Sequence, residues 1–172
     1  MLSNYINIII RFIVLVLVQV LILNNIELGN YVNPYLYILF IILLPIQTPN
    51  ILVLSLSFLL GISIDMFSNT PGIHAAACVF IGFARPATLQ ALAPRDGYDA
   101  ESIPSIKEMG LGWFLSFSAI MVVLHHIALF FLEIFHFQEF FQTLGRATLS
   151  SIFTLVLIII VQFLFASGRR LK

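Results

Sequence analysis

The sequence contains very little charge and a single cysteine. Of its 172 residues 9% are charged, and eight lysines and arginines balance eight aspartates and glutamates, so the formal net charge is zero. An average soluble domain carries roughly a quarter charged residues, so this chain has too little polar surface to cover a water-soluble globule. The neutral balance gives no basic patch for nucleic acid. Cys78 alone can form neither an internal disulfide nor a structural metal site.

Hydrophobic residues are abundant and occur in long stretches. Hydrophobic residues make up 60% of the chain and include 17 phenylalanines, which excludes a disordered protein. A membrane-spanning helix needs about 20 mostly apolar residues. Five stretches meet or approach this length and a sixth is short. We therefore predict an all-α, polytopic membrane helix bundle of six transmembrane segments, the second one short, in a single domain over residues 1–172. The stretches are 5–23, 35–47, 51–67, 72–92, 111–135 and 147–166.

The short stretch 35–47 allows more than one arrangement. Asn33 and Pro34 suit the start of a helix, because asparagine caps it and proline tolerates the first position. At about 1.5 Å per residue the stretch reaches only roughly 20 Å. It either extends by a turn, thins the bilayer, or folds with the next stretch as a re-entrant hairpin through residues 47–50. Every arrangement leaves both termini on one side.

The positions of the basic residues predict the orientation. With the N-terminus inside, seven of the eight cations lie on the cytoplasmic side, as the positive-inside rule requires. Both termini are therefore predicted to be cytoplasmic, and residues 94–109 to form a polar cytoplasmic loop. The seven are Arg11, Arg85, Arg95, Lys107, Arg169, Arg170 and Lys172, and Arg146 lies outside.

Ionisable residues inside a membrane are expensive and therefore indicate function or specific structure. Asp65 lies at the outer end of its stretch, on the same helix face as Gly61, and Pro71 and Gly72 follow in a turn. Asp65 either binds a partner, cation or substrate or accepts hydrogen bonds from the turn and holds the helical hairpin together. Arg85 and Pro86 are interpreted as the inner end of a helix, with Arg85 extending to the lipid headgroups.

Other polar residues are scattered along the apolar stretches. His74 shares a face with Cys78, and two ligands do not make a metal site. His125, His126 and Glu133 form either a proton relay or a set of hydrogen bonds between helices, with the glutamate at the outer interface. Gln19 suits bonding between helices. The sequence has no Gly-x-Ser-x-Gly elbow, no His-Glu-x-x-His pair, no phosphate-binding loop and no paired intramembrane carboxylates. No enzyme activity, cofactor or metal is predicted.

Read in order, several landmarks resemble MreD, the small rod shape-determining membrane protein family of bacteria. They are Gln19, the Asn33-Pro34 pair, the segment from Gly61 to Asp65, the Pro71-Gly72 pair, and the small-residue helix that reaches Arg85. The resemblance covers the layout of the whole chain and, at the level of motifs, residues 55–86. Residues after Pro34 depart from it because no acidic residue follows, and the loop 94–108 is longer than usual.

The resemblance implies a non-enzymatic membrane scaffold of the bacterial cell-elongation complex, in the cytoplasmic (inner) membrane. Its partners would be MreC, the MreB filament, the RodA glycosyltransferase and its class B penicillin-binding transpeptidase, besides membrane lipids. It also implies a fold similar to the S-components of energy-coupling-factor (ECF) vitamin transporters. The alternative is therefore a solute-binding, S-component-like subunit, with Asp65, His74 and the histidines of the fifth stretch lining a pocket.

Overall fold

The computed structural model describes residues 2–26, 32–99, 102–134 and 140–167. Within these residues the chain is helical and contains no strand, which confirms the all-α prediction. The elements are α1 (Leu2–Leu21), the 3-10 helices η1 (Leu23–Asn25) and η2 (Leu36–Ile38), α2 (Leu39–Ile42), α3 (Asn50–Ser68), α4 (Ile73–Ala91), α5 (Ile106–Met109), α6 (Leu111–Ile134) and α7 (Phe140–Ser167).

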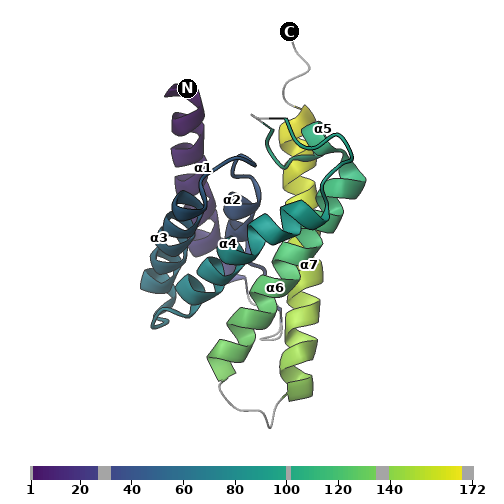
Figure 1. Cartoon of the computed structure of the whole chain (residues 1–172). Coiled ribbons are helices and arrows are strands. Elements are labelled where there is room, and N and C mark those ends of the chain that lie inside the picture. Colours follow the sequence, from purple (N-terminus) through teal and green to yellow (C-terminus); the bar gives the residue numbers. More distant parts are fainter. Residues whose placement is uncertain (1, 27–31, 100–101, 135–139, 168–172) are drawn as a thin grey trace.

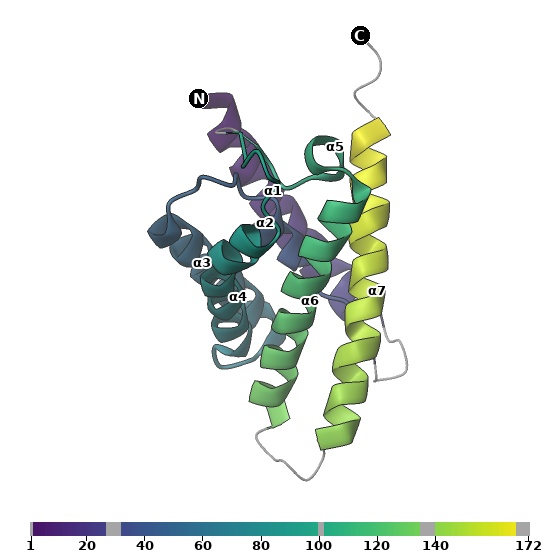
Figure 2. The same ribbon diagram turned by 45° about the vertical axis from the view of Figure 1, so that its right-hand side comes forward.

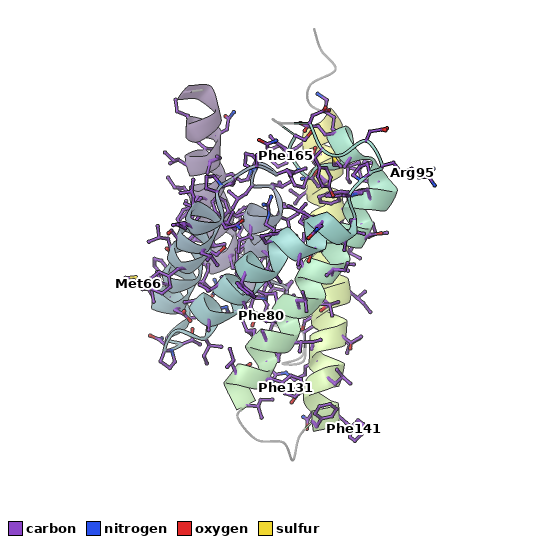
Figure 3. The ribbon with its side chains drawn as sticks, viewed as in Figure 1. Met66, Phe80, Arg95, Phe131, Phe141 and Phe165 are labelled. Carbon is purple, nitrogen blue, oxygen red and sulfur yellow. The ribbon has the colours of Figure 1, made fainter. Side chains whose placement is uncertain are left out.

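Four segments in the described part of the chain are long and apolar enough to cross a membrane. They are Ile6–Asn25, Asn50–Ser68, Leu111–Ile134 and Phe140–Phe165. Large apolar side chains on the surface fit this assignment. Met66, Phe141 and Phe165 are at least three-quarters exposed and point away from the helices in Figure 3. The protein is a multi-pass membrane protein, and six spans are not confirmed.

Three predicted boundaries differ in the structure. The second apolar stretch is helical only from Leu36 to Ile42. Arg85 and Pro86 are not the inner end of a helix as interpreted, because α4 continues to Ala91 with Pro86 inside it, close to the end of the predicted stretch 72–92. The last helix begins at Phe140 rather than at residue 147. The missing N–H of a proline removes one hydrogen bond of a helix, and the packing of α4 against its neighbours outweighs that loss.

The two ends of the molecule differ in what they contain. Figures 1 and 2 show the start of α1, the end of α7 and α5 at one end, which we call the terminal end. The α3–α4 turn, the end of α6 and the start of α7 lie toward the opposite end, called the hairpin end. Helix α4 packs on α3 along one side and on α6 along the other, and α6 packs on α7.

The segment η2–α2 forms the centre of the core. Its side chains from Tyr37 to Ile42 are at most 2% exposed, so the segment is enclosed by the other helices. The chain enters it from an extended stretch at residues 33–35. Its seven residues rise by roughly 10–14 Å, well short of the 30 Å of a bilayer core. The short stretch is therefore an internal element of the bundle.

Helices α3 and α4 approach each other at two glycines. A Cβ added at Gly61 would lie 2.4 Å from Cα of Ala75, and one at Gly82 would lie 2.6 Å from Oγ of Ser57. The contact at Gly61 is with backbone, which cannot move aside as a flexible side chain can. Glycine at this position therefore sets the separation of the two helices.

We expect Gly61→Ala to lower the stability of the protein by about 2 kcal/mol or more, because the added methyl group collides with the α4 backbone. The unfolding midpoint in detergent measures the effect. Gly145→Ala is the control, since a Cβ at Gly145 in α7 meets no atom within 4 Å. Alanine there is expected to be neutral or to stabilise by up to about 1 kcal/mol. Equal midpoints for the two variants would contradict the close approach.

Candidate functional site

The enclosed segment η2–α2 cannot use water to satisfy its end groups, and other helices supply the partners. Oε1 of Gln19 accepts a hydrogen bond from N of Leu36 at 2.9 Å, and Nε2 of Gln19 donates to O of Pro34 at 3.0 Å. Gln19 is 1% exposed. One amide on α1 therefore satisfies a donor and an acceptor at the start of the segment.

Two hydroxyl groups on α7 hold the extended stretch before it. Oγ of Ser150 accepts from N of Asn33 and Oγ1 of Thr154 accepts from N of Tyr35, each at 3.0 Å. Ser150 and Thr154 are four residues apart and so lie on one face of α7. The extended stretch is therefore bound by its backbone to α7 as well as to α1.

Two arginines satisfy the other end of the segment. Nη1 of Arg11 in α1 donates to O of Leu43 at 2.8 Å. Nη2 of Arg85 in α4 donates to O of Leu44, and to O of Pro45 at 3.3 Å. Arg85 is 1% exposed, so the prediction that it extends to the lipid headgroups is wrong. The carbonyl groups of Leu44 and Pro45, which follow α2, hold its guanidinium inside the bundle.

A cluster of five aromatic side chains lies beside the segment, and we call it the histidine–tyrosine cluster. The hydroxyl group of Tyr37 lies 2.8 Å from Nδ1 of His74 and 2.9 Å from Nε2 of His125. A hydroxyl has one hydrogen, so Tyr37 donates to one ring and accepts from the other. It thereby joins α4 to α6 through η2. The members are Tyr35, Tyr37, His74, His125 and His126.

His126 connects the cluster to α7. Its Nδ1 lies 2.9 Å from O of Val122, and a carbonyl can only accept, so Nδ1 carries a hydrogen. In the neutral ring Nε2 then accepts from the hydroxyl of Thr154, 3.2 Å away. Thr154 accepts at the same time from N of Tyr35. The ring of Tyr35 lies among the three histidine rings, with centroids 5.3–5.9 Å apart.

Asp65 lies at the hairpin end and is 3% exposed. Its Oδ1 accepts from Oγ1 of Thr70 at 2.5 Å and from N of His74 at 3.0 Å, and its Oδ2 accepts from N of Ala75 at 2.9 Å. The carboxylate thus caps the first turn of α4 from the preceding helix, where the helix dipole also favours an anion. This arrangement corresponds to the hairpin-holding reading of Asp65.

The residues of the α3–α4 turn can adopt the backbone conformation that the turn requires. Asn69 ends α3 in the left-handed region with φ of 53°, which asparagine tolerates. Gly72 precedes α4 with φ of 84°, where a side chain would be strained. Pro71 lies between Thr70 and Gly72 and is exposed. The turn residues therefore position the α4 backbone N–H groups over Asp65.

A hollow of about 400 Å³ opens at the hairpin end, and we call it the polar hollow. Most of its polar groups bond to one another: Nε2 of Gln19 donates to Asn24, and Nδ2 of Asn24 donates to Ser68. Glu133 lies on its rim and forms a 3.9 Å ion pair with Arg146. The polar residues of its lining include Gln19, Asn24, Asn33, Tyr35, Ser68, Thr70, His74 and Glu133.

An apolar groove of about 650 Å³ runs along the outer surface of α3 and α4. Small residues form part of its lining, and Phe58, Phe80 and Phe83 are 44–74% exposed beside them. Phe80 points outward from α4 in Figure 3. The lining consists of Leu54, Phe58, Ile62, Gly72, Ala75, Ala76, Val79, Phe80 and Phe83, which we call the apolar groove.

The loop 94–109 packs on the terminal end and contains the one-turn helix α5. Tyr98 donates from its hydroxyl to O of Leu89 at 2.7 Å, and Trp113 donates from Nε1 to O of Leu92 at 2.8 Å. These bonds satisfy carbonyl groups at the end of α4. Burial raises the pKa of Tyr98 above its ordinary value, so its hydroxyl remains a donor over the whole range of physiological pH.

The structure thus brings some of the residues singled out in the sequence together and separates others. Gln19, His74, His125 and His126 all contact η2–α2 or the stretch before it, directly or through Thr154. Arg85 lies at the other end of the segment and Glu133 on the rim of the hollow. In the described part of the chain, His, Cys, Asp and Glu residues form no group able to hold a metal ion.

Sequence reasoning missed the residues at the centre of the cluster. In the sequence, Tyr35 and Tyr37 belong to the short apolar stretch 35–47 and were given no polar role. Arg11 was used only to predict the orientation of the chain in the membrane. The four-residue spacing of Ser150 and Thr154 on one helix was a usable signal for interhelical bonding. Three of the basic residues used to predict the orientation lie outside the described residues: Arg169, Arg170 and Lys172.

We expect Tyr37→Phe to lower stability by about 1–2 kcal/mol, because two buried ring nitrogens lose their shared partner. The unfolding midpoint in detergent measures this loss. Tyr35→Phe is the control: it keeps the ring contacts, and the hydroxyl it removes has no hydrogen-bond partner among the described residues. Equal effects of the two changes would contradict the bridging role of Tyr37.

Comparison of the chain with models of protein families, with characterised proteins and with solved structures finds no match.

Proposed function

We propose that this protein is a non-enzymatic membrane scaffold of the bacterial cell-elongation complex, similar to MreD. The observation that carries the proposal is the division between its interior and its surface. The interior polar groups bond mainly to one another, whereas an apolar groove remains open on the surface toward the lipid. A scaffold needs such packing surface and no reactive group.

The apolar groove is the proposed seat of the single membrane helix of MreC. On α3 the groove residues Leu54, Phe58 and Ile62 recur every four positions, so the groove follows the helix axis. On α4 it extends from Gly72 to Phe83, about 16 Å or three helical turns. Small residues in such a groove let a second helix approach closely, which drives helix association where lipid is as apolar as the side chains.

The proposal includes the orientation in the membrane that the basic residues predict. In the proposal the terminal end, where Arg95 lies (Figure 3), faces the cytoplasm and the MreB filament. The loop 94–109 carries Arg95 and Lys107. RodA and its class B penicillin-binding transpeptidase are the further membrane partners that the resemblance implies, in the bacterial inner membrane.

We expect Ala76→Phe to reduce co-purification of the MreC-like protein of the same genome by about tenfold, equivalent to ~1.4 kcal/mol of binding energy. Ala76 is an exposed residue of the groove, so the larger ring blocks the seat without disturbing the core. Ser116→Phe places the same ring on the exposed surface of α6 and is the control. Equal recovery with both variants would contradict the groove as the binding site.

A second candidate function is that of a solute-binding subunit similar to an ECF S-component. The polar hollow favours it, because the hydroxyl of Tyr35 and the carboxylate of Glu133 both border the hollow. A vitamin-sized solute would then raise the unfolding midpoint of the purified protein, and Glu133→Gln would abolish the rise. A panel of solutes that leaves the midpoint unchanged would remove this candidate.

A further inference from the structure

One nitrogen atom of the histidine–tyrosine cluster determines where the hydrogens of the cluster lie. Nδ1 of His125 is fully buried and has no hydrogen-bond partner among the described residues. A buried N–H group without an acceptor is rarer in proteins than a buried acceptor without a donor. In the neutral ring that an apolar interior favours, the hydrogen therefore lies on Nε2, which faces the hydroxyl of Tyr37 at 2.9 Å.

This assignment passes through Tyr37 to His74. Because the oxygen of Tyr37 accepts from Nε2 of His125, its O–H donates to Nδ1 of His74, 2.8 Å away. The hydrogen of the neutral His74 ring then lies on Nε2, which has no partner among the described residues and is not fully enclosed by protein atoms. His74 is 5% exposed and lies in the lining of the polar hollow. The hollow thus contains a largely buried N–H donor that the protein does not use.

Tyr35 and Glu133 add two further groups to the same hollow. The rings of Tyr35 and His74 lie 5.3 Å apart, and the hydroxyl of Tyr35 has no hydrogen-bond partner among the described residues. Glu133 is the only charged side chain in the described part of the lining. Its Oε2 lies 3.9 Å from Nη2 of Arg146, too far for a hydrogen bond, and the side chain is 43% exposed. The carboxylate therefore retains free acceptor positions.

We propose that the polar hollow binds a small molecule in which a protonated amine lies next to a carbonyl group, as in an amino acid or its amide. The amine donates to the carboxylate of Glu133, and the carbonyl oxygen accepts from Nε2 of His74. The volume of about 400 Å³ is near the lower end of the range of ligand pockets, which suits a ligand of this size. The inference rests on the second candidate function, that of a solute-binding subunit, and is independent of the apolar groove.

The positions of the hydrogens can be tested without a ligand. Nitrogen NMR of the full-length protein, labelled at its histidine rings and held in detergent, distinguishes the two neutral forms of each ring. His74 and His125 are expected to carry their hydrogen on Nε2, and His126 on Nδ1, which faces a carbonyl group. A hydrogen on Nδ1 of His74 would overturn the proposal, because the hollow would then lack its donor.

The ligand class is tested at neutral pH with three molecules of matched shape. Alaninamide has both groups, isobutyramide has a methyl group in place of the ammonium group, and isopropylamine has a methyl group in place of the carboxamide. Alaninamide is expected to raise the unfolding midpoint at concentrations about tenfold lower than either analogue, because each analogue leaves one group of the hollow without its partner. Equal responses to the three molecules would overturn the ligand class.

Two variants assign the groups of the ligand to side chains. Glu133→Gln is expected to remove the advantage of alaninamide over isobutyramide and to leave its advantage over isopropylamine. Tyr37→Phe is expected to do the reverse, because Nδ1 of His74 loses its donor and the ring can then carry its hydrogen on either nitrogen. A general loss of stability would lower both advantages alike, so the opposite effects of the two variants separate binding from folding.

Asp96→Asn is the matched control, since it removes a carboxylate from the exposed part of the loop 94–109. If it lowers the advantage of alaninamide as much as Glu133→Gln does, general attraction of the amine explains the binding and the site is wrong. If the three molecules act equally while a larger solute raises the midpoint through Glu133, only this ligand class falls. If no solute raises the midpoint, the solute-binding function falls with it.

Discussion

The backbone N–H and C=O groups at the ends of one short enclosed helix need hydrogen-bond partners. This requirement determines which side chains the surrounding helices direct toward it. In an apolar interior each unpaired N–H or C=O group costs as much as a lost hydrogen bond or more, and η2–α2 has such groups at both ends. Gln19 and two hydroxyl groups of α7 satisfy the first end, and Arg11 and Arg85 satisfy the second. Helices α1, α4 and α7 are thereby fixed around a segment that is itself too short to span a membrane.

Two buried charged side chains, Asp65 and Arg85, lie at helix ends where the helix dipole favours their sign. Asp65 is an anion at the N-terminus of α4, where backbone N–H groups point toward it. Arg85 is a cation at the carbonyl end of α2. Both positions match the helix dipole, and both bury a charge that would be unfavourable without its backbone partners. The difference is that Asp65 accepts hydrogen bonds from three donors, whereas the buried Nε–H of Arg85 has no acceptor among the described residues.

The interior polar groups of this protein bond mainly to one another, so contacts with other molecules fall to its surface. The apolar groove lies on the surface of α3 and α4, and the polar hollow opens at the hairpin end. In the proposed function the groove receives a partner helix.

The sequence by itself determined what depends on composition and on neighbouring residues. Membrane insertion and the helices α1, α3, α6 and α7 follow from long apolar runs, because a bilayer selects on length and hydropathy. The turn that carries Asp65, Thr70 and Gly72 was recognisable because its contacts are local.

Only the tertiary structure decided the rest. It buried Arg85 and placed Tyr37 between two histidines. Both outcomes depend on groups more than 30 residues away, and hydropathy contains no record of them. A buried arginine and a lipid-facing one have the same local sequence signature, and the carbonyl groups of Leu44 and Pro45, which follow α2, made the difference.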